Sequence, residues 1–375
     1  MKLIFCGNLH TGGGVQVATS FIKDLVNMSQ DLSEYDVILS TKIFDELKRL
    51  DINLSQFNKV FVLDYYGLRV NKNFRKPEIN YEVCFVVFGP IYYSLYANRY
   101  IVGFAQPWIA YSENDAYRKV SLISSIKNRI EFFIKDLIFR KYDDLVVEHD
   151  HVRNALLNKG YKSNIHVVSN TYSSVFDDKA SWQSLKLPSN MKNGFTLGFL
   201  GRAYPHKNLD ILKEVNEILI SQYSLKINFL FTLNDKDMRE LGFDAIENFH
   251  SVGEINLNQC PNFYKYLDAL IFPSMLECFS ATPIESMKME TPVFCSNYPF
   301  LSEICGNAAI YFDATSSDDI ARVIHNNINN ADILNNNVSR GLNIIEALPE
   351  SEHRTLAYLK LMNDVGRINE KKWLL

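Results

Sequence analysis

The sequence predicts an α/β protein made of two doubly wound domains, each built around a parallel β-sheet. Length is the first reason, because 375 residues exceed one ordinary core and fit two domains. The second reason is a repeated opening: an apolar strand, a glycine-containing turn and an amphipathic helix occur at residues 2–26 and again at 195–219. The third is that strand-like and helical runs alternate in both halves of the chain.

Strand-like runs define the order of elements in each half. In the first half they are DVILS, KVFVLD, EVCFVVF, DLVVEHD and IHVVSN, and in the second KINFLFTL, ALIFPS, TPVFCS and AAIYFD. We expect Rossmann-like domains at 1–178 and 194–350, joined by a polar linker at 179–193. Residues 351–375 are expected to form a C-terminal helix or tail that packs back on the first domain. Ligands of such sheets bind at the carboxyl ends of the strands, so the cleft between the domains is the expected site.

Composition excludes several classes of protein. The formal net charge of −4 gives no dominant basic face, so no nucleic-acid partner is expected. No apolar run approaches the ~20 residues that span a bilayer. The first residues, MKLIFCG, hold too few apolar residues for a secretory signal, and we interpret them as a buried strand. The six cysteines are scattered without a Cys-x-x-Cys pair, as in reduced cytoplasmic proteins.

Two cations follow the first strand of the second half. Arg202 comes directly after Gly201, and Lys207 lies five positions further. Asn208 is expected to cap the next helix. A guanidinium, an ammonium and helix-terminal N–H groups at the carboxyl end of a strand suit a diphosphate. The alternative is that both side chains are solvated loop cations.

Two glutamates lie eight positions apart in PSMLECFSATPIESMKMETPV, which follows the strand ALIF. Glu285 has a structural alternative as the acidic member of a capping box, because Thr282 fits an N-cap and Pro283 the first helical position. Glu277 lies five residues before that cap and has no such role. Small residues beside it let backbone N–H groups approach a phosphate while its carboxylate accepts hydrogen bonds from sugar hydroxyls.

These motifs together resemble one enzyme family. The ordered elements GRAYPHKN, VGEI, PSMLECFSATPIESMKMETPVFCSN and SEICGNAAIYFD are similar to the C-terminal domain of family 4 glycosyltransferases. Members are retaining enzymes of the GT-B fold, in which two Rossmann-like domains face each other across a cleft. The resemblance covers Gly194 to Asp313 and is supported earlier by the triple glycine at 12–14. It implies an acceptor-binding first domain and a nucleotide-sugar-binding second domain.

The resemblance implies a role for each matching residue. Arg202 and Lys207 hold the donor diphosphate and stabilise the leaving group, and Glu277 accepts hydrogen bonds from the donor sugar. These three are the expected catalytic residues. Glu285 accepts from the ribose hydroxyls. The other donor-binding positions contribute mainly backbone groups: Gly13, Gly14, Phe279, Ser280 and Ala281. Such a set suits a transition state with positive charge on the sugar and negative charge on the departing phosphate.

The chain departs from the family pattern at three points. Ser280 and Glu290 stand where relatives usually have glycine. We expect the first to permit close approach of a ligand and the second to alter only a turn. The acceptor-side histidine of many relatives has no matching motif, and the candidates are His10 and His149. For His10 the alternative is that it caps the glycine loop.

Neither metal-like cluster is expected to bind a metal. Residues 235–237 have the Asp-x-Asp form, but they precede a helical stretch, where acidic side chains favour the helix N-terminus. Residues 148–151, Glu-His-Asp-His, end one strand and begin a helix, and nothing else completes a zinc set. No cofactor is expected besides the nucleotide diphosphate sugar, which is a co-substrate.

Residues 118–141 form a basic amphipathic segment. RKVSLISSIKNRIEFFIKDLIFRK contains seven basic and two acidic residues, and apolar side chains recur in it at helical spacing. The first interpretation is a helix packed on the core by its apolar face. The alternative is peripheral contact with an anionic membrane, which the lipid-linked acceptors of the family also favour.

We therefore expect a retaining, metal-independent hexosyltransferase that acts on a glycan or lipid-linked glycan acceptor. Bacterial surface polysaccharide or lipopolysaccharide assembly is the expected context. The expected location is the cytoplasm, including the inner face of the cytoplasmic membrane. Two alternatives stay open, a nucleotide-sugar epimerase of the same architecture and a catalytically silent assembly partner. A Rossmann dehydrogenase is not expected, because HTGGGVQV lacks the G-x-G-x-x-G spacing.

Overall fold

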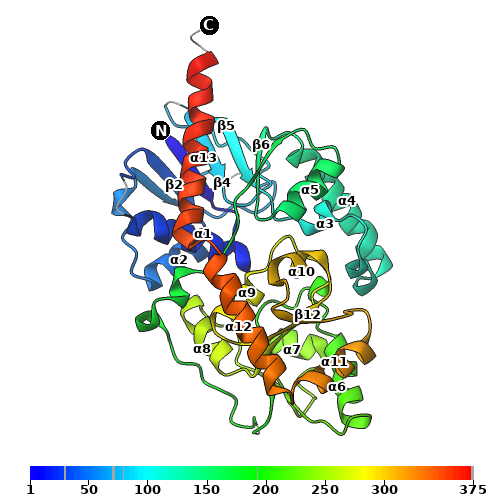
Figure 1. Cartoon of the computed structure of the whole chain (residues 1–375). Helices are drawn as coiled ribbons and strands as arrows, with labels where there is room; N and C mark the ends of the chain where they lie inside the picture. The colour runs from blue at the N-terminus through cyan, green and yellow to red at the C-terminus, as the bar shows by residue number, and fades with distance from the viewer. Residues whose placement is uncertain (29–30, 70–71, 79, 192, 373–375) are drawn as a thin grey trace. The chain divides into compact units, whose positions relative to one another are not determined.

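The computed structural model describes residues 1–28, 31–69, 72–78, 80–191 and 193–372, and its chain divides into two compact units (Figure 1). The first unit contains Met1–Ala110, Lys127–Ser173 and Pro349–Leu375. The second contains Tyr111–Ile126 and Ser174–Leu348. Both units are therefore assembled from separate pieces of the chain: Pro349–Leu375 belongs to the first unit, and Tyr111–Ile126 belongs to the second.

A seven-stranded parallel sheet forms the centre of the first unit, in the strand order β3-β2-β1-β4-β5-β6-β7. The order reverses between β1 and β4, as in doubly wound folds. The strands are β1 (Lys2–Cys6), β2 (Tyr35–Leu39), β3 (Lys59–Val62), β4 (Tyr81–Val86), β5 (Ala97–Gly103), β6 (Asp144–Val147) and β7 (Asn164–Val167). The helices are α1 (Gly13–Asn27), α2 (Thr41–Arg49), η1 (Leu54–Gln56), α3 (Pro107–Ala110), α4 (Leu122–Phe139), α5 (Asp150–Asn158) and α13 (Ser351–Lys372). The first residues of α4, as far as Ile126, are assigned to the second unit.

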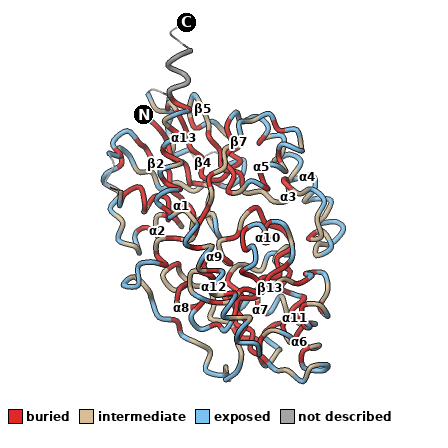
Figure 2. Tube along the Cα trace, viewed as in Figure 1, coloured by how far each residue is buried: buried red, intermediate tan, exposed pale blue. Residues whose placement is uncertain are grey.

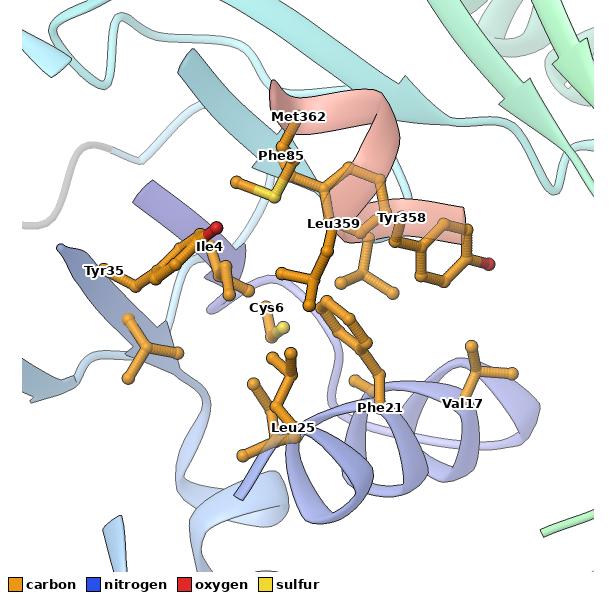
Figure 3. Packing of buried hydrophobic residues seen from close by; sticks show 14 of the residues in the cluster. Ile4, Cys6, Val17, Phe21, Leu25, Tyr35, Phe85, Tyr358, Leu359 and Met362 are labelled. Carbon is orange, nitrogen blue, oxygen red and sulfur yellow. The ribbon is translucent and has the colours of Figure 1, made fainter. Parts of the chain in front are cut away.

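The core of the first unit lies between this sheet and helices α1 and α13. The apolar face predicted for α1 is buried, and Phe21 is its central member. Tyr358 of α13 packs against Phe21 with 5.3 Å between ring centroids and against Phe85 of β4 with 4.8 Å (Figure 3). Residues more than 330 positions apart thus share one core, and the C-terminal helix completes it.

The second unit contains a six-stranded parallel sheet in the order β10-β9-β8-β11-β12-β13. Its strands are β8 (Thr196–Phe199), β9 (Asn228–Phe231), β10 (Phe249–Ser251), β11 (Ala269–Phe272), β12 (Val293–Ser296) and β13 (Ala309–Phe312). The α-helices are α6 (Ile211–Ser221), α7 (Asp235–Leu241), α8 (Cys260–Lys265), α9 (Ala281–Lys288), α10 (Pro299–Cys305), α11 (Ser317–Asn327) and α12 (Ala331–Ala347). The 3₁₀ turns are η2 (Asp115–Lys119), η3 (Ser174–Phe176), η4 (Lys179–Ser181), η5 (Pro205–Lys207) and η6 (Leu257–Gln259).

Two strands were absent from the sequence prediction. β5 has the polar pair Asn98 and Arg99 directly after its first residue, Ala97, and only its last three residues are buried. β10 has three residues, two of which are polar. Apolar runs identify buried strands, so strands that begin in polar residues or are very short escape that criterion.

The segment expected as a linker, 179–193, is attached to the second unit. The N–H of Gln183 donates to the carbonyl of Asn258 at 2.9 Å, and the Asn262 side chain donates to the Gln183 carbonyl at 2.8 Å. The Lys265 ammonium lies 4.5 Å from the centre of the Trp182 ring. These contacts hold in place a polar segment whose described residues form only the short η4 turn.

Burial follows the sheets in both units. Figure 2 shows their strands mostly in the colour of buried residues, with helical outer faces exposed. All six cysteines are buried and free of disulfides. Burial raises the pKa of the Cys6 thiol far above its usual range, which suits an inert core side chain.

Candidate active site

The predicted donor-site motifs lie on two neighbouring loops of the second unit. β8 pairs with β11 in parallel, so the loops that follow these strands leave the same edge of the sheet. The first loop contains Arg202 and Lys207, and the second contains Glu277. A hydrogen bond of 2.8 Å from the N–H of Met275 to the carbonyl of His206 joins the two loops.

Lys207 and Glu277 form a largely buried ion pair. The Lys207 Nζ lies 2.5 Å from Glu277 Oε1, and their side chains are 13% and 10% exposed. The Ser274 hydroxyl donates to the same carboxylate oxygen at 2.6 Å. The ammonium also lies 4.7 Å from the centre of the Phe272 ring. The site therefore holds an ammonium and a carboxylate in fixed positions, which suits a ligand carrying both phosphates and hydroxyls.

His206 lies beside this ion pair. Burial lowers the pKa of its imidazole to about 4, and the Lys207 ammonium acts in the same direction, whereas Glu277 opposes it. The ring is consequently neutral at pH 7. Tyr204 stacks on the ring with a centroid distance of 5.6 Å. Lys207 thus supplies positive charge to this part of the loop while His206 remains uncharged.

Arg202 lies further along the sheet edge, toward β10. Its guanidinium forms an ion pair with Glu254, in the VGEI loop after β10. Asn234 donates to the same glutamate oxygen at 3.0 Å. The Arg202 side chain is 33% exposed, so it remains accessible to a ligand anion. The structure thus places Arg202 on the predicted edge, paired with a carboxylate that sequence reasoning did not assign.

Glu285 is buried inside helix α9 and is not the capping residue that its sequence context suggested. The helix begins at Ala281 with Ser280 as N-cap, two residues earlier than the capping-box interpretation required. The Tyr264 hydroxyl donates to Glu285 Oε2 at 2.8 Å. Burial raises the pKa of the carboxyl to about 7, although the Tyr264 hydrogen bond opposes the rise. The side chain therefore changes charge near neutral pH.

The backbone between the two glutamates has an ordinary conformation. Ser280 has φ −132° and ψ 120°, which any residue adopts, so serine in place of the family's glycine creates no strain here. Its side chain makes no capping hydrogen bond. The first N–H groups of an α-helix have no intrahelical acceptor, and α9 therefore presents donors where the phosphates are expected.

Asn208 does not cap the helix that follows it. Its backbone is left-handed, with φ 57°, and it ends the short η5 turn. The fully buried side chain donates instead to the carbonyl of Ala314, at 2.8 Å. This bond fixes the loop that carries Lys207 to the segment after β13.

The remaining predicted donor residues lie in the first unit. Gly12 has φ 70° and stands at the N-cap of α1, which begins at Gly13. A Cβ on Gly14 would lie 3.3 Å from the Leu9 side chain, so a larger residue would crowd that turn. The glycine loop thus forms an exposed helix start, as expected of a loop that meets a phosphate.

The two histidine candidates have structural partners in the first unit. His10 Nε2 lies 2.9 Å from the carbonyl of Tyr65, and its ring stacks on Tyr66 at 4.2 Å. These contacts tie His10 to the loop after β3, which differs from the glycine-loop cap considered from the sequence. His149 is the N-cap of α5, and its side chain accepts from the N–H of His151 at 3.5 Å.

The metal-like clusters of the sequence serve local structure. Asn234 caps α7 by accepting from the N–H of Asp237 at 2.9 Å, and Asp235 lies in the same first turn. The buried Glu148 accepts from Asn170 at 2.6 Å. Among the described residues, no group of three or more His, Cys, Asp or Glu side chains is placed to hold a metal ion.

A pocket of about 540 Å³ opens at the carboxyl ends of β12 and β13. Inside it the Tyr298 hydroxyl donates to Asp115 at 2.7 Å, and Arg118 pairs with the same aspartate at 3.1 Å. The lining is mainly polar and suits a hydroxyl-rich molecule. It is formed by Asp115, Arg118, Asn297, Tyr298, Tyr311, Phe312, Asp313, Ala314, Thr315 and Asp319.

Four site residues were not singled out from the sequence: Ser274, Tyr264, His206 and Glu254. His206 and Glu254 lie inside the motifs GRAYPHKN and VGEI, so the sequence located them but did not reveal which residues they contact. Ser274 follows β11 by two positions, where the carboxyl-end rule points. Tyr264 lies on another helix, and no spacing in the sequence relates it to Glu285.

Comparison with known proteins identifies the second unit. Residues 186–341 match the family model described as "Glycosyl transferases group 1". This stretch contains all six strands of the second sheet and the four residues Arg202, Lys207, Glu277 and Glu285. It is therefore a group 1 glycosyltransferase domain, and the resemblance to family 4 glycosyltransferases is confirmed.

Individual relatives agree over shorter stretches. The O-antigen chain mannosyltransferase RfbU of Salmonella typhimurium is 28% identical over 117 residues, which are 30% of this chain and 32% of that protein. The uncharacterized glycosyltransferase 335 of Sulfolobus islandicus rod-shaped virus 1 is 31% identical over 124 residues, 32% of this chain and 36% of the relative. The chain thus spans about a third of the length of the curated relatives it matches.

Solved structures match almost the whole chain. Anabaena Alr3699/HepE in complex with UDP-glucose aligns with 97% of this chain and 100% of its own, at a TM-score of 0.65 and 12% identity. The sucrose-phosphate synthase from Thermosynechococcus elongatus aligns with 97% and 99% at the same TM-score and identity. These matches, with the two parallel Rossmann-like sheets, confirm the predicted GT-B fold class.

Proposed function

We propose that this protein is a retaining glycosyltransferase that moves a hexose-type sugar from a nucleotide diphosphate sugar to an acceptor hydroxyl. The observation that carries the proposal is the buried Lys207–Glu277 pair on adjoining loops at the carboxyl ends of β8 and β11. The group 1 glycosyltransferase match and the similarity to the mannosyltransferase RfbU support the same class. The UDP-glucose complex of the similar HepE structure supports a nucleotide sugar as donor.

The proposed chemistry breaks the bond between the sugar C1 and the diphosphate oxygen. The diphosphate leaves with the electron pair, and Lys207 and Arg202 stabilise the charge it gains. The acceptor oxygen forms the new bond to C1 on the same face, and its proton passes to the departing phosphate. Glu277 holds the sugar through its hydroxyls, and Glu285 holds the ribose. Gly13 and Gly14 are the proposed donor-binding residues of the first unit.

The acceptor is proposed to be a glycan or a lipid-linked glycan. Assembly of a bacterial surface polysaccharide or lipopolysaccharide is the proposed context, since the relative RfbU is an O-antigen chain mannosyltransferase. We place the reaction in the cytoplasm or at the inner face of its membrane, where nucleotide sugars are made. The donor is a co-substrate, and the proposal includes no metal and no cofactor.

Lys207→Ala tests the proposed role of the ammonium. Loss of one group that stabilises the developing charge typically costs about 10²–10³-fold in kcat, and we expect a fall in turnover of that size. Nucleoside diphosphate release from a panel of UDP and GDP sugars measures it. Lys226→Ala is the matched control, because Lys226 lies in the same unit but pairs with Glu247 on the surface.

Normal turnover by a folded Lys207→Ala variant contradicts the proposal. Thermal unfolding shows whether the variant is folded, and Glu277→Gln gives a second test if it is not. The epimerase alternative predicts an epimer of the donor in the absence of acceptor. The silent-partner alternative predicts that no nucleotide sugar of the panel raises the melting temperature of the wild-type chain.

A further inference from the structure

Helix α4 carries an unusual amount of exposed apolar surface. Seven of its large apolar side chains are between 47% and 85% exposed. They account for seven of the sixteen exposed large hydrophobic residues in the described part of the chain. We call them the α4 stripe: Leu122, Ile123, Ile126, Ile130, Phe133, Ile134 and Leu137. The core-packing interpretation of residues 118–141 is therefore wrong for most of the helix.

The stripe is continuous along one side of α4. At about 100° per residue, the seven side chains fall within an arc of about 120°. Lys127 lies just beyond one edge of this arc and Arg129 just beyond the other, and both are exposed. Lys141 adds a further basic residue beyond the C-terminal end of the helix. The result is an apolar band with basic side chains on both flanks.

The opposite side of α4 is fixed to the first unit. Phe139, its one buried residue, packs on Phe104 with 4.7 Å between ring centroids. Phe132 stacks on Trp108 at 5.8 Å. Arg140 donates to the carbonyl of Lys159 at 3.0 Å. These contacts set the rotation of the helix, and the side chains of the stripe remain exposed.

The charges around the stripe fit one kind of partner. Both acidic residues of α4 have basic partners: Lys135 pairs with Glu131 at 2.7 Å, and Arg140, one residue beyond the helix, pairs with Asp136 at 2.8 Å. The flanks therefore present a net positive charge next to the apolar band. A second copy of the helix would bring like charges together along both flanks, whereas an anionic lipid surface offers phosphates to the flanks and acyl chains to the stripe.

We infer that α4 docks the protein on an anionic membrane surface, with the stripe in the boundary between headgroups and acyl chains. Lys127 and Arg129 meet the lipid phosphates on either side. Contact is peripheral, since every helix in the described ranges falls short of the length and hydropathy needed to cross a bilayer. The inference deepens the proposed function, because a docked transferase meets a lipid-linked acceptor, but the docking itself requires no donor.

Vesicle sedimentation tests the docking without any nucleotide sugar. With vesicles of phosphatidylglycerol and phosphatidylcholine in equal parts, at low salt, the wild-type chain is expected to sediment with the lipid. Replacing Ile126, Ile130 and Phe133 by serine should lower the partition coefficient at least tenfold, with the fold intact because all three are exposed. Ile220→Ser is the matched control, since Ile220 is an exposed apolar residue of α6 and should leave binding unchanged.

A charge variant distinguishes the contribution of the basic flanks from that of the apolar stripe. Lys127→Glu combined with Arg129→Glu should abolish the preference for phosphatidylglycerol over pure phosphatidylcholine vesicles and remove the salt dependence. Failure of the wild type to sediment overturns the inference, as does unchanged binding of the triple serine variant. The inference is also overturned if the wild type does not bind vesicles but forms a dimer in sedimentation velocity that the triple serine variant does not form. Turnover with a soluble acceptor tests the proposed function separately from these results.

Discussion

Glu285 is a buried carboxyl whose ionisation costs folding free energy. Burial raises its pKa to about 7 from an ordinary value of 4.5. Between these pH values the folded chain keeps a proton that the unfolded chain has released. The free energy of unfolding therefore falls as pH rises through this window, by up to about 3 kcal/mol for this group alone, and is highest below it.

We predict that Glu285→Gln removes this loss. The amide still accepts from the Tyr264 hydroxyl and cannot ionise, so the variant should gain stability relative to the wild type as pH rises from 4.5 to 7. Urea unfolding of both proteins at pH 5 and pH 8 measures the difference. A stability difference that is the same at both pH values argues against a buried acid. Donor affinity is expected to fall in the variant, because a neutral amide is a weaker acceptor for ribose hydroxyls than a carboxylate.

Ser274 positions Glu277, and we predict that Ser274→Ala impairs catalysis. The fully buried hydroxyl donates to Glu277 Oε1 at 2.6 Å. A hydrogen bond to a charged group contributes about 1.5–3 kcal/mol, so kcat/KM for the donor should fall about tenfold or more. Ser286→Ala is the matched control, because its buried hydroxyl donates to the Thr291 carbonyl away from Glu277. Equal loss of stability with loss of activity only in Ser274→Ala supports positioning, and equal activity in both variants refutes it.

At this scale the sequence predicts charged residues better than their partners. The order and spacing of Lys207 and Glu277 around two strands placed them at one sheet edge, and the structure joins them at 2.5 Å. The interpretation of Glu285 as a cap was wrong, because local spacing cannot reveal that Tyr264 on another helix binds its carboxylate. Partners that are distant in the chain require the folded structure.

At the scale of elements, the end of α9 shows where the chain departs from its family. Glu290 follows the C-cap Met289 and has φ 59°, in the left-handed region. The N–H of Thr291 donates to the carbonyl of Ser286 and that of Glu290 to the carbonyl of Met287, the two bonds of a Schellman motif. The left-handed C′ position of a helix normally holds glycine, which explains why relatives usually have glycine where this chain has Glu290.

Glu290→Gly is therefore predicted to stabilise the protein. Left-handed backbone costs a non-glycine residue about 1–2 kcal/mol, and the extra entropy of unfolded glycine offsets part of that gain. We expect a net increase of up to about 1 kcal/mol in the free energy of unfolding, measured in urea. Glu290→Ala is the control, because it removes the exposed carboxylate but keeps the left-handed strain. A gain of equal size in both variants would assign the effect to charge instead.

Elements were predictable to the extent that apolar periodicity decides them. Largely buried strands such as β4 and β9 and the amphipathic α1 followed their sequence patterns. The same pattern favoured a core-packed apolar face for α4, and that prediction was wrong because the apolar side of α4 is exposed. Periodicity identifies an apolar face, but it does not show whether that face packs on the protein core or contacts a lipid surface.

At the scale of the whole molecule, the first unit is completed by the last part of the chain. Helix α13 adds Tyr358, Leu359, Met362 and Val365 to its core. Arg354 of the same helix is 2% exposed and donates to Asn170 at 2.5 Å and to Ser20 at 2.8 Å. The sequence predicted a C-terminal helix there. It did not predict that a buried arginine of this helix would bind Ser20, in α1, and Asn170, after β7.

Arg354→Ala is predicted to be the most destabilising of these substitutions. Arg354 lies 3.8 Å from Asp24, which is also 2% exposed, and burial raises the pKa of that carboxyl while Arg354 opposes the rise. Removing the guanidinium leaves a buried carboxyl without its cation, which costs about 3–5 kcal/mol. Urea unfolding at pH 8 measures the loss. The double variant Arg354→Met, Asp24→Asn should recover part of it, because no buried charge remains, and a single variant within ~1 kcal/mol of the wild type would show that α13 is held by its apolar contacts alone.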